Sequence, residues 1–170
     1  MPDARKVMLL GDIGVGKTSL ARRLVFDRFE ADYKATIGVD IYTHDVTANV
    51  RGTDVPLTLV IWDVDGDFGD SIFNHAYIRG AAGALIIADR TRASTISSML
   101  DLSLGFADTL PGRPYRLVVN KSDLMAADDA ALSAARKVAG AALIETSAKS
   151  GAHVADAFTA IAAEILARSL

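Results

Sequence analysis

The sequence predicts an α/β fold: a six-stranded, mostly parallel sheet with one antiparallel hairpin strand and about five helices on both faces. Short apolar runs alternate along the chain with longer segments of helical periodicity, as in a parallel sheet whose connections are helices. Near the start, two β-rich runs over 39–50 and 55–62 are joined by turn residues instead, which indicates an antiparallel hairpin. The 170 residues suit one domain, and the chain shows no linker, repeat or low-complexity tract. We therefore expect a single domain over residues 1–170.

The individual elements follow from where apolar residues gather. Two runs, 84–88 and 115–119, are continuously apolar, which is typical of strands buried on both faces of a parallel sheet. In chain order the expected strands are 7–10, 39–50, 55–62, 84–88, 115–119 and 141–144, with the hairpin turn at 51–54. The expected helices are 17–26, 94–107, 128–139 and 152–168. Around the first of them, Leu20, Leu24 and Phe29 lie close to one face.

The composition excludes several classes of protein. The net charge is 18 − 21 = −3 without a long charged run, which argues against a nucleic-acid partner. The absence of cysteine excludes disulfides, cysteine zinc sites, thiolate catalysis and prenyl or palmitoyl attachment to this chain. No apolar stretch approaches the roughly 20 residues of a membrane span, and position 2 is not a myristoylation glycine. We expect a soluble, cytoplasmic protein with no direct lipid anchor in this chain.

A phosphate-binding loop is the most specific motif. Residues 11–18 fit the pattern G-x-x-x-x-G-K-[S/T], after an expected strand and at the start of an expected helix, which predicts a P-loop NTPase. Glycines let backbone N–H groups curl around phosphate oxygens, and the helix N-terminus adds the positive end of its dipole. Lys17 would reach the outer phosphates, and the Thr18 hydroxyl would bind Mg²⁺. The alternative is a glycine-rich turn that contains an incidental lysine.

A second pair of motifs selects the base. Residues 120–123, Asn-Lys-Ser-Asp, stand at the carboxyl end of an expected strand, where ligands bind in open α/β sheets. The Asp123 carboxylate can accept two hydrogen bonds from the guanine edge, whereas adenine offers no such donor pair. Taken alone, this segment fits a helix N-cap or Asx turn better. Residues 145–149, Glu-Thr-Ser-Ala-Lys, follow the last strand and favour guanine, because a backbone N–H there can reach the base O6.

Taken in order, these segments resemble those of Ras-superfamily small GTPases, and the resemblance covers nearly the whole chain. The matching segments are 11–18, Thr36, 63–66, 120–123 and 147–149. Residues 33–40 look most like the first switch of the Rab branch, and residues 77–81, after the second switch, also look most like that branch. The resemblance implies a molecular switch that binds GTP or GDP with Mg²⁺ and contacts effector and regulator proteins through its switch segments. We expect it to act as a monomer.

The resemblance also implies roles for individual residues. Thr36 would reach Mg²⁺ and the γ-phosphate, Asp63 would hold Mg²⁺ through water, and the Gly66 N–H would sense the γ-phosphate. The implied metal ligands are Thr18, Thr36 and Asp63, and the implied catalytic residues are Lys17, Thr36, Gly66 and Asp67. The implied nucleotide-binding residues are Ile13, Gly14, Val15, Gly16, Lys17, Thr18, Ser19, Phe29, Tyr33, Thr36, Gly66, Asn120, Lys121, Asp123, Ser147, Ala148 and Lys149.

Two lysines and three aromatic side chains have expected roles, and for the aromatic ones packing is the alternative. Lys121 and Lys149 would flank the base plane, and Phe29 would pack against the guanine, although a Phe after a helix is more often a core residue. Trp62 and Tyr77 resemble the aromatic pair that Rab effectors contact, and simple packing explains these two equally well.

The sequence departs from the family in the second switch. Residues 62–68 read W-D-V-D-G-D-F where the family has W-D-T-A-G-Q-E, so Asp67 replaces the water-positioning glutamine and Asp65 adds a carboxylate. Ile13 stands where the family has a small residue and would crowd an arginine supplied by a partner. The interval from Thr36 to Asp63, 63 − 36 = 27 residues, is longer than usual and predicts a longer hairpin loop near 49–53.

We therefore expect a Rab-like GTPase that hydrolyses GTP slowly. The alternative is a GTP-binding interaction module with negligible hydrolysis. A P-loop kinase or ATPase is disfavoured because it would leave residues 120–123 and 147–149 without a role.

Overall fold

All six strands join one sheet in the order β2-β3-β1-β4-β5-β6, which confirms the predicted fold class. The computed structural model describes residues 2–32, 34–126 and 129–169. Its strands are β1 (Asp3–Leu10), β2 (Val39–Val50), β3 (Thr53–Val64), β4 (Gly83–Asp89), β5 (Tyr115–Asn120) and β6 (Leu143–Glu145). Only the pairing of β2 with β3 is antiparallel. The loops that follow the parallel strands therefore gather at one edge of the sheet.

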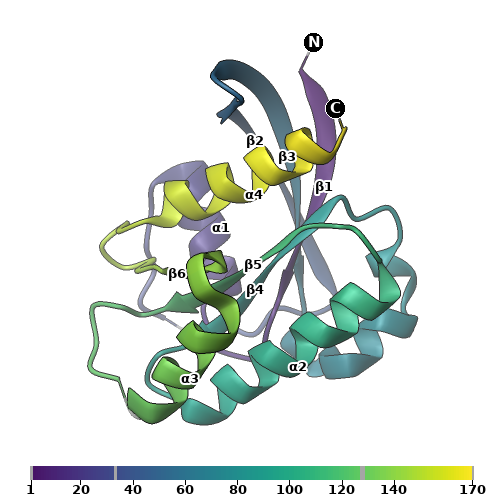
Figure 1. The fold of residues 1–170 in the computed structure, drawn as a ribbon. Coiled ribbons are helices and arrows are strands. Elements are labelled where there is room, and N and C mark those ends of the chain that lie inside the picture. The colour runs from purple at the N-terminus through teal and green to yellow at the C-terminus, as the bar shows by residue number, and fades with distance from the viewer. Residues whose placement is uncertain (1, 33, 127–128, 170) are drawn as a thin grey trace.

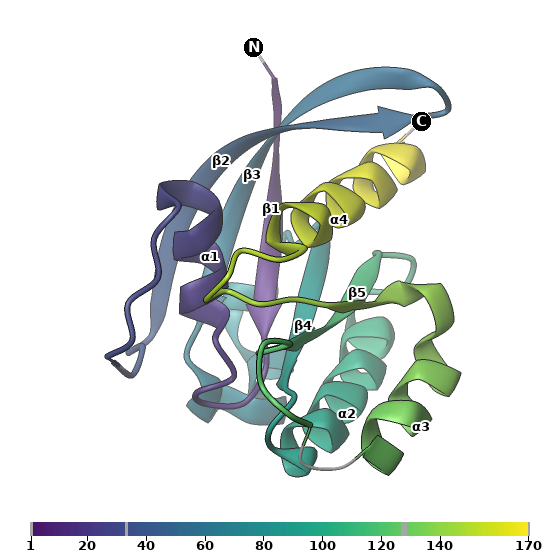
Figure 2. The ribbon, with the colours of Figure 1, turned by 90° about the vertical axis from the view of Figure 1, so that its left-hand side faces the viewer.

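Helices cover both faces of the sheet (Figure 1), and alternation along β1 supplies both cores. Val7 and Leu9 belong to the core beneath α1 (Lys17–Phe26) and α4 (Val154–Ser169). Met8 and Leu10 belong to the core beneath α2 (Ala93–Thr109) and α3 (Asp129–Ala139). β1 begins and α4 ends on the side of the molecule opposite the edge where β1 runs into the first loop (Figure 2).

The hairpin closes in a two-residue turn, so the prediction of a longer loop near 49–53 was wrong. The ladder pairs β2 with β3 without a break from Val39↔Val64 to Val50↔Thr53. Arg51 and Gly52 both have positive φ, 52° and 83°, as a type I′ turn requires. The 27-residue interval from Thr36 to Asp63 (63 − 36) is taken up by the two paired strands rather than by an irregular loop.

Two strand boundaries differ from the sequence prediction for a physical reason. β1 begins four residues before the expected Val7, at Asp3, because its polar start pairs in register with β3. β6 begins at Leu143 rather than at residue 141, because residues 140–142 form a 3₁₀ turn that starts at Gly140 with φ 56°. Pairing with a neighbour decided the first boundary and a glycine turn the second.

The second switch forms short 3₁₀ helices instead of a regular α-helix. They are η1 (Gly66–Asn74) and η2 (Ala76–Ile78), and Gly69 interrupts η1 with a non-helical backbone. A further 3₁₀ turn, η3 (Gly140–Ala142), precedes β6. Over the described parts of the chain, no helix combines the length and apolarity needed to cross a membrane.

Candidate nucleotide-binding site

The loop between β1 and α1 is held close to two neighbouring strands. At Gly16, which has φ 103°, an added Cβ would lie 2.2 Å from the Asn120 amide nitrogen. At Gly11, an added Cβ would lie 2.3 Å from the carbonyl oxygen of Ile87 in β4. Any side chain at either position would push the loop off the sheet edge, so both positions require glycine.

Five consecutive loop carbonyls accept hydrogen bonds from side chains. The Lys17 Nζ donates to the carbonyls of Gly11 and Asp12, at 2.8 and 3.0 Å. The next three carbonyls, those of Ile13, Gly14 and Val15, accept from Arg92 Nη2 at 2.7 Å, Lys121 Nζ at 3.0 Å and Asn120 Nδ2 at 3.0 Å. Because the N–H and C=O of a trans peptide point in opposite directions, these contacts turn the amides of Gly14 and Gly16 to the other side of the loop. The loop thus presents backbone donors in the manner of an anion site.

Lys17 brings a buried positive charge to this loop. Lys17 is only 6% exposed, and among the described residues no carboxylate lies within ion-pair distance of its ammonium. Burial lowers the pKa of Lys17, while the nearby carboxylates of Asp63, Asp12 and Asp65 oppose that shift. A buried ammonium held only by carbonyls is well placed to receive an anionic ligand.

Three predicted metal ligands meet beside Lys17. The Thr18 hydroxyl donates to Asp63 Oδ2 at 2.5 Å and lies 2.8 Å from the Thr36 hydroxyl. These residues come from the start of α1, the segment before β2 and the end of β3, so the fold gathers them from 45 residues of chain. Their oxygens are the hard ligands that Mg²⁺ prefers.

Asp63 is the residue that fits a cation best. It is fully buried, and its second oxygen, Oδ1, has no hydrogen-bond partner among the described residues. Burial raises the pKa of Asp63 to about 6, against an opposing hydrogen bond from Thr18. No cluster of three or more His, Cys, Asp or Glu side chains suited to a metal occurs in the described segments.

The two base motifs are joined through Asn120 and Asp123. Asn120 Oδ1 accepts from the Ala148 N–H at 3.2 Å and from the Thr146 hydroxyl at 3.1 Å. Asp123 Oδ1 accepts from the Ser147 hydroxyl at 2.7 Å, and the Asp123 side chain is exposed at the sheet edge. The predicted base-binding segments therefore form one connected loop pair, with the Asp123 carboxylate on its surface.

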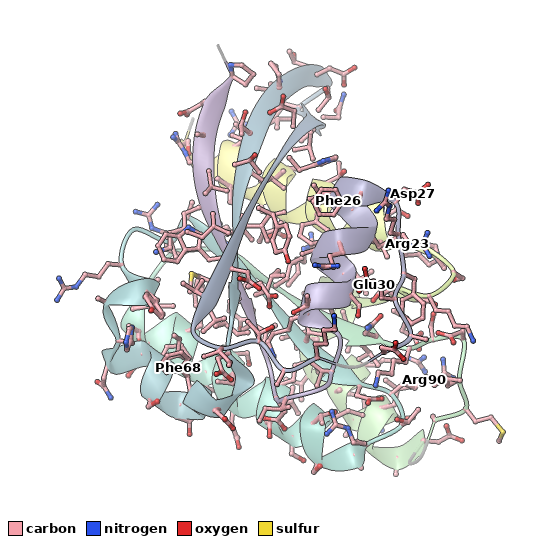
Figure 3. The ribbon with its side chains drawn as sticks, turned by 180° about the vertical axis from the view of Figure 1, so that it is seen from behind. Arg23, Phe26, Asp27, Glu30, Phe68 and Arg90 are labelled. Carbon is pink, nitrogen blue, oxygen red and sulfur yellow. The ribbon has the colours of Figure 1, made fainter. Side chains whose placement is uncertain are left out.

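Three residues that the sequence analysis did not single out hold this edge together. Arg23 of α1 donates to the carbonyls of Ala148 and Lys149 at 2.8 and 2.5 Å (Figure 3). Asp89, at the end of β4, accepts from Lys121 Nζ at 2.7 Å and from Arg92 Nε at 3.1 Å. The only sequence signal for Asp89 was its place at the carboxyl end of an apolar strand, and Arg23 and Arg92 carried none.

The charge of Asp89 is stabilised by these partners. Burial acts to raise the pKa of Asp89, but the hydrogen bonds from Lys121 and Thr91 outweigh it and hold that pKa below its ordinary value. The ionised carboxylate thus fixes Lys121, whose own backbone adopts a left-handed φ of 67°.

Phe29, the aromatic residue that follows α1, lies outside the core. Phe29 is 39% exposed and belongs to neither core cluster, so its interpretation as a core residue was wrong. Tyr33 lies outside the described residues. Phe26, at the end of α1, makes an edge contact with Tyr42 on β2 instead.

The second switch touches the phosphate loop at Gly66. An added Cβ there would lie 2.5 Å from the Ile13 backbone nitrogen. The Asp65 N–H donates to the Gly38 carbonyl at 2.9 Å and links the two switches, while its carboxylate caps η1 by accepting from the Asp67 N–H at 2.9 Å. Asp67 itself is exposed. The two extra carboxylates therefore differ, since one closes a turn and the other faces outward.

Trp62 and Tyr77 form part of a half-buried aromatic cluster. Their ring centroids lie 6.0 Å apart, and Phe68 and His75 contact Tyr77 at 5.8 and 4.1 Å. The Lys6 ammonium lies 3.5 Å from the centroid of the Trp62 ring. The cluster packs against the core beneath α2, so packing accounts for part of these aromatics, and contact with partner proteins stays a prediction.

Comparisons with known proteins agree with this arrangement. The chain matches the Ras family over residues 6–167. It is 33% identical to Ras-related protein Rab-13 of Canis lupus familiaris over 96% of this chain and 81% of that protein. It is 35% identical to Ypt/Rab-type GTPase YPT7 of Saccharomyces cerevisiae, over 95% and 81% of the two chains. It is also 35% identical to GTP-binding protein yptV2 of Volvox carteri, over 96% and 76%.

Proposed function

The chain belongs to the Ras family of small GTPases, in its Rab branch, and we propose that it binds GTP and GDP with Mg²⁺ at this site and hydrolyses GTP slowly. The observation that carries the proposal is the buried Lys17 ammonium, which two loop carbonyls hold and which has no carboxylate partner among the described residues. A phosphate chain would supply the missing negative charge and accept from the inward amides.

The cation site supports the magnesium part of the proposal. Thr18 and Thr36 offer hydroxyl oxygens, and Asp63 offers the buried oxygen that lacks a partner among the described residues. When bound, Mg²⁺ neutralises charge on the outer phosphates. The hydroxyls of Thr18 and Thr36 and the carboxylate of Asp63 thus lie together already, and one oxygen of this buried carboxylate lacks a hydrogen bond within the described residues.

Guanine preference is assigned to Asp123. Its carboxylate has one oxygen engaged by Ser147 and lies at the exposed edge of the base loops. Two hydrogen bonds from the guanine N1–H and 2-amino group would satisfy it, and adenine would leave it unpaired.

The switch is assigned to Thr36 and Gly66. The Asp65–Gly38 backbone bond couples their segments, and Gly66 lies against the loop where the γ-phosphate would end. Loss of that phosphate would release both segments together. Partner proteins would read this change, as the Rab relatives imply.

Slow hydrolysis follows from Asp67. A glutamine amide can donate to and accept from the attacking water, whereas an ionised aspartate only accepts and brings negative charge toward an anionic phosphate. Asp67 is exposed, and no ion pair among the described residues includes it. The second candidate, an interaction module with negligible hydrolysis, rests on the same residue.

The nucleotide that accompanies the purified protein tests the proposal. Gentle purification, denaturation and chromatography of the released small molecules should give close to one equivalent of GDP or GTP. Titration with fluorescent nucleotides should then show preference for GDP over ADP. Equal affinity for guanine and adenine nucleotides, with neither carried through purification, would contradict the proposal.

A further inference from the structure

Arg92 occupies an unusual place beside the phosphate loop. It lies at the N-cap of α2, 79 residues from the carbonyl of Ile13 to which its Nη2 donates at 2.7 Å. Its Nε donates at the same time to the buried carboxylate of Asp89 at 3.1 Å. The side chain stays 44% exposed, and Nη1 has no hydrogen-bond partner among the described residues. Nε and Nη2 of the guanidinium are thus held by Asp89 and Ile13, and within the described part of the chain Nη1 is left without an acceptor.

Arg92 and the second switch contact adjacent peptides of the phosphate loop, on either side of Ile13. Gly66 approaches the backbone of Asp12 and Ile13 so closely that an added Cβ would lie 2.8 and 2.5 Å from their C and N atoms. Asp65, which precedes Gly66, is near enough to raise the pKa of Lys17, whereas Asp67, which follows it, is exposed. Arg92 and the second switch therefore reach the loop at the same residue, Ile13.

The charge of Arg92 acts on the site as well as its hydrogen bonds. Burial lowers the pKa of Lys17, and the positive charge of Arg92 lowers it further, while Asp63, Asp12 and Asp65 raise it. The guanidinium is therefore close enough to contribute to the field at the Lys17 ammonium. Together they give this end of the loop two positive charges.

We propose that Arg92 is a built-in positioning residue for the terminal phosphate of GTP. It holds the Ile13 carbonyl outward, which orients the Gly14 amide, and it supplies positive charge that offsets the carboxylate of Asp65. The inference rests on the proposed function, because it needs a nucleoside triphosphate in the loop. It gives the chain its own arginine at a place where Ile13 would crowd one delivered by a partner.

The guanidinium has the chemistry for this role. Its planar fork donates to the Asp89 carboxylate and the Ile13 carbonyl simultaneously, which a lysine ammonium on a flexible stem does less well. A lysine would nonetheless keep the charge. The alternative role is an ordinary ion pair at the start of α2, and this would stabilise the loop equally for GDP and GTP.

The test compares affinities for GDP and for a non-hydrolysable GTP analogue, which separates phosphate positioning from hydrolysis. Parent protein, Arg92→Ala, Arg92→Lys and Arg90→Ala are measured in Mg²⁺ buffer by displacement of a fluorescent nucleotide. Arg92→Ala should lose about tenfold more affinity for the analogue than for GDP, as expected for one charge-assisted contact. Arg92→Lys should recover much of that preference.

Arg90→Ala is the matched control. Arg90 lies two residues away and pairs with Glu145 at 3.3 Å (Figure 3), so its loss should leave the GDP-to-analogue ratio unchanged. An unchanged ratio of GDP affinity to analogue affinity in Arg92→Ala, whether or not both affinities fall, would overturn the inference and leave the proposed function intact. A parent that binds neither guanine nucleotide would overturn both. If Arg92→Ala does not fold, as judged by thermal melting, Arg92→Gln provides the same comparison.

Discussion

The phosphate loop and the second switch meet at Ile13 and Gly66, yet they are held in place by different means. Every loop carbonyl from Gly11 to Val15 accepts from a lysine, arginine or asparagine side chain. The second switch consists of short 3₁₀ turns broken at Gly69, and its acidic side chains are mostly exposed. Tertiary contacts thus fix the geometry of the loop, whereas most acidic side chains of the second switch lie on the surface.

The difference separates binding from turnover. Residues that position phosphate are locked by tertiary contacts, so their substitution should damage binding severely. The residue that would position water is exposed and unpaired among the described residues, so its substitution should alter the hydrolysis rate and leave binding in place.

Gly16→Ala should have the largest effect. The added Cβ would meet the Asn120 amide at 2.2 Å, and the residue would be strained at φ 103°. Strain and the displaced amide together should cost roughly 4 kcal/mol, or about a thousandfold in GDP affinity. Gly52→Ala is the control, because φ is 83° there and nothing lies within 4 Å of an added Cβ. Similar GDP affinity in the two variants, measured by calorimetry, would show that the loop is less constrained than the contacts indicate.

Asp123→Asn should weaken guanine binding by about a hundredfold, because it removes the charge from two hydrogen bonds to the base. The amide can donate to a 2-oxo group, so xanthosine diphosphate should bind better than GDP to this variant. Competition with both nucleotides measures the change. Asp101→Asn, an exposed aspartate on α2, should behave like the parent. Retained guanine preference in Asp123→Asn would remove this residue from the base site.

Asp63 should make the stability of the nucleotide-free protein depend on pH. Burial raises its pKa to about 6 from 3.8, so between about pH 4 and 6 the folded protein binds more protons than the unfolded one. The free energy of unfolding should therefore fall as pH rises through this window. Asp63→Asn removes the buried charge and should stabilise the protein by roughly 1–3 kcal/mol at pH 7.5 in EDTA. Thermal melts at several pH values check this, with Asp101→Asn again as control. Parallel pH curves for parent and Asp63→Asn would contradict it.

Thr36→Ala should act on one nucleotide state only. The Thr36 hydroxyl reaches Thr18 at 2.8 Å and would serve the metal and terminal phosphate. We expect about a tenfold loss of affinity for a GTP analogue and almost none for GDP. Thr43→Ala, on the exposed side of β2, should change neither affinity. Equal losses for the two nucleotides would mean that the first switch has been assigned to the wrong residue.

The parts of the site that the sequence predicted are contiguous. Residues 11–18 and 120–123 are recognisable from the order of their own residues and from the apolar strand that precedes each of them. Arg92 could not be found in this way, because its partner Ile13 lies 79 residues away and the contact depends on how β4 stands beside β1. The length of the hairpin loop was mispredicted for a related reason. Residues 49–53 include several turn formers, and only the continuous pairing of the two strands shows that the turn is limited to Arg51 and Gly52.

The most direct test of the separation between binding and turnover is single-turnover GTP hydrolysis by the parent and by Asp67→Gln. Restored water positioning should make Asp67→Gln at least about tenfold faster, while GDP and GTP-analogue affinities remain within about twofold. Asp70→Gln, another exposed aspartate in η1, should hydrolyse at the parent rate. A parent that hydrolyses GTP as fast as Asp67→Gln, or faster, would contradict the account.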